Sequence, residues 1–162
     1  MEQEYTESNC CFEYKYTTLK LDDLLEDLKL NNIYKAVDFI ILKEKKNFFI
    51  EVKSYDTFQK NVIDENITKI IKKLSDSYFI LNFLNKEQIS KFNKNLKGKL
   101  TLVILICPIQ NIEITPDRLV GLGEILKKFQ KKLKLLNVEI ILDTKENKLG
   151  FFKNINYTIR KN

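Results

Sequence analysis

Three charged residues, Asp38, Glu51 and Lys53, stand inside two otherwise apolar segments and could do chemistry. Residues 36–42 read AVDFIIL and residues 47–53 read NFFIEVK, both rich in Phe, Ile and Val. An ionised side chain is costly to bury unless it is paired or binds a metal, so these positions need an explanation. Because side chains alternate between the two faces of a strand, Glu51 and Lys53 lie on the same face.

The spacing of the two segments predicts a β-hairpin closed by the four residues 43–46. If Leu42 pairs with Asn47, then Asp38 lies opposite Glu51, and opposed residues share a face with Cβ atoms about 4.5–5.5 Å apart. Two carboxylates at that separation repel each other unless a cation lies between them. Carboxylate oxygens are ligands that Mg²⁺ accepts, so the hairpin predicts a cation site.

The pattern of Asp38 followed after twelve residues by Glu51, Val52 and Lys53 resembles the PD-(D/E)XK nuclease superfamily, also called restriction-endonuclease-like. The resemblance covers mainly residues 20–106. It implies that Asp38 and Glu51 bind Mg²⁺ or Mn²⁺ and that the carbonyl of Val52 is a third ligand. It also implies that Lys53 is catalytic and assists the attacking water.

The chain departs from the superfamily pattern at several points. Val37 stands where the motif has a proline. The superfamily often has an acidic residue on its first helix, for which Glu26 is the candidate here and Glu13 the alternative. The superfamily usually has a strand between its first helix and the motif aspartate. Here only residues 31–35 are available for that strand, unless residues 10–16 supply a displaced one.

The resemblance implies metal-dependent hydrolysis of phosphodiester bonds in nucleic acid, with DNA favoured over RNA, in defence, restriction or repair. One alternative is a catalytically inactive module of the same fold that binds nucleic acid or a partner protein. Another is an ion cluster that only stabilises a strand end. Association as a homodimer or with a partner protein stays open.

The charge of the chain is unevenly distributed. The net charge is +6, yet residues 1–30 carry eight acids and three lysines, so the remaining residues carry +11. The basic residues after position 30 favour a polyanionic partner such as nucleic acid. The alternative, with equal weight, is that these lysines only cover solvent-exposed faces. Lys69, Lys72 and Lys73 are candidates for contact with a nucleic-acid backbone, and the basic face of the expected helix over 117–136 is another.

The hydrophobic periodicity predicts a single α/β domain over residues 1–162, a restriction-endonuclease-like mixed sheet flanked by helices, with 1–9 as a flexible acidic N-terminus. Apolar residues at helical spacing predict helices over 21–28, 62–81 and 117–136, and a capping box predicts a short one over 85–96. Strands are expected over 10–16, 100–106, 138–142 and 149–159, beside the hairpin. The segment 100–106, apolar except for Thr101, predicts a central strand covered on both faces.

Composition excludes several classes of site. The chain has no His, which rules out His-based triads and His-ligated zinc. The three cysteines, Cys10, Cys11 and Cys107, form no Cys-x-x-Cys pair, so reduced thiols in a cytoplasmic protein are expected. The acidic start and the short apolar runs predict neither a signal peptide nor a membrane partner.

Overall fold

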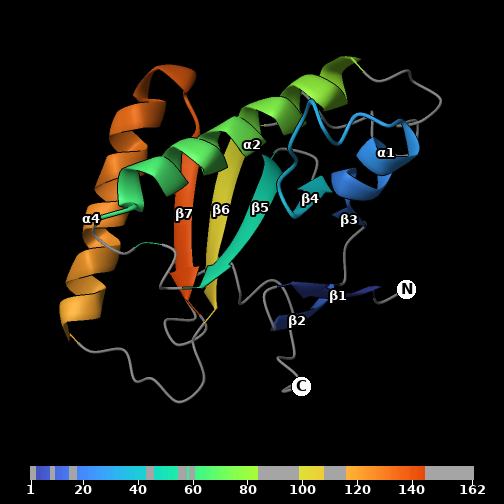
Figure 1. Cartoon of the computed structure of the whole chain (residues 1–162). Helices are drawn as coiled ribbons and strands as arrows, with labels where there is room; N and C mark the ends of the chain where they lie inside the picture. Colours follow the sequence, from blue (N-terminus) through green and yellow to red (C-terminus); the bar gives the residue numbers. More distant parts are fainter. Residues whose placement is uncertain are drawn as a thin grey trace.

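The structure is a computed structural model, shown in Figure 1. It describes residues 3–7, 10–14, 18–42, 46–54, 58, 61–83, 99–107 and 116–144. Within these ranges a five-stranded sheet is covered by helices, which confirms the predicted α/β class.

The main sheet has the strand order β3-β4-β5-β6-β7. Its strands are β3 (Thr18–Leu19), β4 (Phe39–Leu42), β5 (Lys46–Ser54), β6 (Lys99–Cys107) and β7 (Glu139–Thr144). The pairs β3–β4 and β4–β5 are antiparallel, whereas β5–β6 and β6–β7 are parallel, so the sheet is mixed as expected. Each parallel connection contains a helix, as parallel strands require.

The hairpin β4–β5 has the predicted register. Leu42 pairs with Asn47 and Ile40 pairs with Phe49. Asp38 immediately precedes the first paired residue of β4, Phe39, whose partner is Ile50. The carboxyl groups of Asp38 and Glu51 are therefore brought to the same face of the sheet.

Three helices and a short 3₁₀ helix accompany the sheet: α1 (Leu21–Asp27), α2 (Ile63–Phe83), α4 (Pro116–Leu133) and η2 (Lys134–Leu136). One hydrophobic cluster joins α1, α2 and α4 to one face of the sheet through residues such as Leu25, Ile67, Phe129 and Ile104. Figure 1 shows α2 lying across the sheet with α4 along its β7 side. Residues of the opposite face, such as Val103, are buried too, so β6 is covered on both faces as predicted.

The N-terminal residues differ from expectation. Gln3–Glu7, expected within a flexible terminus, form β1 and pair antiparallel with β2 (Cys10–Tyr14) in a separate two-stranded sheet. Backbone pairing with a neighbouring strand is a tertiary contact that the acidic composition of this segment does not reveal.

In the sheet, β4 lies between β3 and β5. The strand expected before the motif aspartate is therefore β3, and it is supplied neither by residues 10–14 nor by residues 31–35. The predicted helix over 85–96 and strand over 149–159 lie outside the described residues. Within the described ranges, no helix has the length and hydropathy needed to cross a membrane.

Candidate functional site

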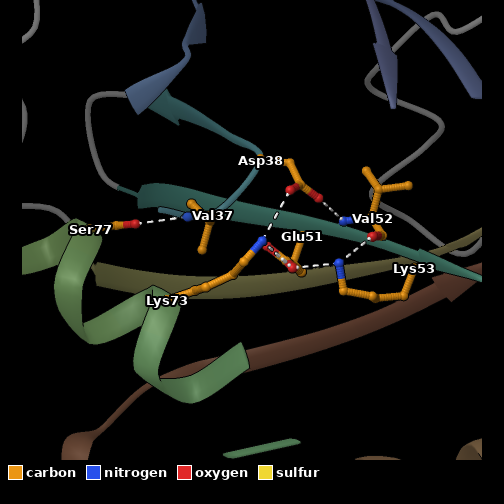
Figure 2. A network of polar contacts seen from close by, with 7 residues as sticks. All are labelled: Val37, Asp38, Glu51, Val52, Lys53, Lys73 and Ser77. Carbon is orange, nitrogen blue, oxygen red and sulfur yellow. Dashed lines mark hydrogen bonds and ion pairs between the residues drawn. The ribbon is translucent and has the colours of Figure 1, made fainter. Parts of the chain in front are cut away.

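Asp38, Glu51 and Lys53 converge in the structure, and Lys73 of α2 joins them. The Lys73 ammonium lies 2.8 Å from Glu51 Oε1 and 3.4 Å from Asp38 Oδ1. The Lys53 ammonium lies 2.6 Å from the same Glu51 oxygen. Figure 2 shows these four residues, hereafter the charge network, between β5 and α2.

Asp38 also completes the backbone hydrogen bonding of the sheet. Its Oδ2 accepts a hydrogen bond from the Val52 amide at 2.6 Å, at a point where β4 has not yet begun. The Val52 carbonyl accepts a hydrogen bond from Lys53 Nζ at 2.9 Å. The Asp38 carboxylate therefore accepts the hydrogen bond that the backbone of a neighbouring strand would otherwise accept. Such an acceptor is needed because a buried amide without a partner is costly.

Helix α2 fixes the segment that leads into Asp38. The Val37 amide donates to Ser77 Oγ at 2.9 Å, and the Lys35 amide donates to Asp76 Oδ2 at 3.0 Å. Ser77 is fully buried. The helix that supplies Lys73 thus also holds the backbone that carries Asp38, so the two sides of the network are positioned together.

Burial governs the electrostatics of the charge network. The exposed fraction is 0% for Glu51 and 5% for Asp38. Burial raises the pKa of Glu51, the negative charge of Asp38 adds to the rise, and the two lysines oppose it. For Lys73, burial alone acts to lower the pKa, but the charges of Glu51 and Asp38 outweigh it, so its pKa is raised.

The residues of the charge network fit an internal ion pair better than a bound divalent cation. Lys73 lies between the two carboxylates, at the position where the sequence predicts a metal. Among the described residues, no three Asp, Glu, His or Cys side chains come together. Glu51 Oε2 is buried and has no hydrogen-bond partner within the described ranges. The expectation that Asp38, Glu51 and the Val52 carbonyl bind Mg²⁺ or Mn²⁺ stays a prediction, with Lys73 as the competing cation.

The acidic residue near the network on the first helix is Asp22, which sequence reasoning missed. Burial raises the pKa of Asp22, and the charges of Lys73 and Asp38 act on it with opposite signs. Glu26 is exposed one turn later on α1, and no described contact joins it to the network. Glu13 lies on β2, in the separate two-stranded sheet, where it pairs in register with Glu4.

The three lysines proposed for nucleic-acid contact have different environments. Lys69 is exposed and paired with Glu65, and Lys72 is exposed and paired with Asp76. Lys73, by contrast, points toward the sheet and is held by the charge network, so it is not presented to a ligand on the helix surface.

A signal for the role of Lys73 was present in the sequence. Ile70, Lys73, Leu74 and Ser77 share one helical face at spacings of three and four, and Ile70 and Leu74 are core residues. A lysine and a serine on an apolar face need buried partners, and here they find Glu51 and Val37. The partners themselves are not readable from the helix pattern, because they come from other elements.

The comparison with curated proteins gave one informative similarity. The chain is 36% identical, over an alignment of 158 residues including gaps, to a protein named phenylalanine–tRNA ligase beta subunit from Mycoplasma capricolum subsp. capricolum. The aligned region covers 80% of this chain but only 19% of that protein. No protein-family profile matches the chain. No solved structure matches it either.

The similarity overturns the nuclease interpretation. The prediction of a PD-(D/E)XK nuclease, an Mg²⁺-dependent enzyme that cleaves DNA, is wrong, because the similar protein is a tRNA ligase subunit. The physical reason for the misreading is visible in the network, where Lys73 pairs with both carboxylates of the motif. The alternative, a module that binds nucleic acid or a partner without cleaving it, fits the findings better.

Proposed function

We propose that this domain is a non-catalytic nucleic-acid-binding module, with RNA as its ligand and the lysine-rich face of α4 as its interface. The observation that carries the proposal is the surface of α4 and η2. Lys127, Lys131 and Lys134, hereafter the lysine stripe, recur at spacings of four and three and are all exposed. The similarity to a tRNA ligase subunit supports RNA over DNA as the ligand.

Among the described residues, no acid forms an ion pair with a lysine of the stripe. Lys127, Lys131 and Lys134 make no hydrogen bond or ion pair with any other residue in the part of the chain that the structure describes. Other lysines differ in this respect, since Lys69, Lys72 and Lys128 are each paired with an acid. Unpaired cations on one face are available to phosphate groups, which dominate affinity for nucleic acid.

The helix dipole explains only part of this pattern. A lysine in the last turn of a helix stabilises the helix by about 0.3–1 kcal/mol through the dipole. This explanation applies to Lys131 and its neighbour Lys132. Lys127 lies more than a turn earlier, and like charges four residues apart destabilise a helix by about 0.2–0.5 kcal/mol. A row of repelling cations is better explained by a polyanionic ligand than by helix stability.

The rest of α4 holds the stripe in a fixed position. Lys128 pairs with Asp64 of α2 at 3.0 Å, and Lys132 donates to Thr68 Oγ1 at 2.8 Å. Phe129 and Leu133 are buried in the core. The helix therefore cannot rotate freely, and the stripe is presented outward as a rigid row.

The test is a binding titration by fluorescence anisotropy with labelled tRNA and with a single-stranded RNA. The variant is the triple change Lys127→Gln, Lys131→Gln and Lys134→Gln. The control is a triple Lys→Gln change at the α1 end of the molecule, at Lys20, Lys29 and Lys35, which removes the same charge. We expect the stripe variant to bind about 10- to 100-fold more weakly at moderate salt and the control variant to change little.

Three results bear on the proposal. Weaker binding by the stripe variant alone, with RNA recovered intact after incubation with Mg²⁺, supports it. An equal loss in both triple variants would mean that only net charge matters and would contradict the assigned interface. No binding to RNA by the wild type would overturn the proposed function.

A further inference from the structure

A cavity of about 880 Å³ opens beside the end of the lysine stripe. It lies between the second half of α2, the beginnings of β6 and β7, and the turn after η2. Figure 1 shows that β6 and β7 begin at the same end of the sheet, where α2 crosses it. The side chains that matter for its chemistry are Tyr78, Phe79, Asn82, Lys99, Leu136 and Asn137. Its volume falls in the range of about 300–1,000 Å³ that ligand pockets occupy.

The wall contributed by α2 is aromatic and anchored. Tyr78 and Phe79 are 45% and 44% exposed, which is high for large aromatic residues. The Tyr78 ring packs on Phe49 of the core at 6.5 Å, and the Phe79 ring stacks on Tyr34 at 5.7 Å and 21°. Because both rings are already held in place, little side-chain freedom is lost when a flat ligand binds.

The polar groups of the cavity suit the edge of a nucleobase. Asn82 and Asn137 each carry an amide donor and acceptor. Asn82 donates one hydrogen bond to the Tyr78 carbonyl at 2.6 Å, which orients its side chain. Lys99 also lines the cavity, and its ammonium forms an ion pair with Glu139 at 3.2 Å. Aromatic walls with a few hydrogen-bonding groups and a nearby cation are the chemistry that unpaired bases require.

The cavity continues the lysine stripe. Lys134 begins η2, Leu136 ends it, and Asn137, with φ of 49°, turns the chain into β7. At about 2 Å of rise per residue in a 3₁₀ helix, Asn137 lies about 6 Å along the axis from Lys134. A strand whose phosphates follow the stripe therefore reaches the cavity within one or two nucleotides.

We infer that this cavity accepts an unstacked base of a single-stranded RNA segment whose backbone follows the lysine stripe. The inference rests on the proposed function and adds the form of the ligand. Duplex RNA keeps its bases stacked inside the helix and presents only its backbone and groove edges, so it engages the stripe without filling the cavity.

The first experiment needs no variant. Wild-type protein is titrated with a single-stranded RNA, with an abasic strand of equal length and charge, and with a duplex of the same sequence. We expect the abasic strand to bind about 5- to 150-fold more weakly than the normal strand, the range for loss of one stacked base. A 2-aminopurine placed in the single strand should lose fluorescence on binding, since stacking quenches it.

The second experiment uses the double variant Tyr78→Leu with Phe79→Leu, which keeps apolar volume and removes the flat rings. The control is Leu135→Ala, which removes an exposed apolar side chain beside the cavity. We expect the double variant to lose the preference for the normal strand over the abasic strand while its duplex affinity is unchanged. The control should keep both.

The outcomes separate the inference from the proposed function. If the wild type binds normal and abasic strands with equal affinity, and tightly and salt-dependently in both cases, the cavity does not accept a base. The lysine stripe then remains the proposed RNA interface. Retention of the base preference in the double variant also overturns the assignment of the cavity. Failure of the wild type to bind any nucleic acid removes the proposed function and the inference with it.

Discussion

Lys73 shows how a single residue changes the meaning of a motif. Asp38 and Glu51 lie together on one face of the sheet, but the cation between them is an ammonium that belongs to the chain itself. Glu51 is fully buried, and its second oxygen has no hydrogen-bond partner within the described ranges, so its charge depends on Lys73 and Lys53. A buried carboxylate that loses its partner is strongly destabilising, whereas an exposed one is not.

We therefore expect Lys73→Met to lower the free energy of unfolding by about 3–5 kcal/mol, because it leaves two neighbouring buried carboxylates with one lysine. The matched control is Lys72→Met on the same helix, which breaks the exposed pair with Asp76 and should cost about 1 kcal/mol or less. Urea denaturation followed by circular dichroism measures both. Similar losses in the two variants would show that the network is not a source of stability.

At the scale of the element, α2 combines three tasks along its length. Lys73 enters the charge network, Ser77 holds the backbone of Val37, and Tyr78 and Phe79 form the wall of the cavity. Lys73 and Ser77 share one face of α2, one turn apart, whereas Tyr78 and Phe79 lie on other faces, because successive residues of a helix are rotated by about 100°. A change in α2 can therefore affect stability and ligand binding separately.

Ser77→Ala tests the structural task of the helix. It removes the acceptor of the Val37 amide, which is then buried without a partner, and we expect a loss of about 1–3 kcal/mol in the free energy of unfolding. The control, Ser75→Ala, removes a hydroxyl that bonds only to the Ile71 carbonyl of its own helix and should change stability by about 0.5 kcal/mol or less. Thermal and urea melts of the two variants give the comparison, and a neutral Ser77→Ala change would contradict the assigned role.

At the scale of the whole molecule, one hydrophobic cluster connects α1, α2, α4 and the sheet. A domain with a shared core unfolds cooperatively, so binding at one place raises the melting temperature of the whole. The charge network lies inside this unit, between the sheet and α2. Melting experiments therefore report directly on whether a cation enters the network.

We expect millimolar Mg²⁺ or Mn²⁺ to leave the melting temperature of the wild type unchanged, because Lys73 and Lys53 together already balance the charges of Asp38 and Glu51. In Lys73→Gln, which leaves the two carboxylates with Lys53 alone, Mn²⁺ should raise the melting temperature by mass action. EDTA-treated samples and the variant Lys72→Gln are the controls. A clear rise in the wild type would show that a divalent cation displaces the lysine and would restore the predicted metal site.

Local patterns in the sequence predict much of the fold. Segments rich in Phe, Ile and Val located β4 and β5, an apolar run located β6, and helical spacings located α2 and α4. The four-residue loop predicted the hairpin register that places Asp38 beside Glu51. These features follow from local rules, since side-chain direction depends only on position within a strand or helix. The uninterrupted apolar run of residues 102–106 likewise made β6 a buried central strand.

Tertiary structure decided what the local rules could not. Lys73 is 35 residues from Asp38 and 22 from Glu51, so only the packing of α2 on the sheet made it the partner of both. Asp22, in the first turn of α1, feels the charges of Lys73 and Asp38, whereas no described contact joins Glu26, one turn later, to the network. Gln3–Glu7 form a strand because β2 pairs with them. Whether two close carboxylates hold a metal or a lysine depends on which charge the rest of the fold brings to them, and that contact has no signature within the motif.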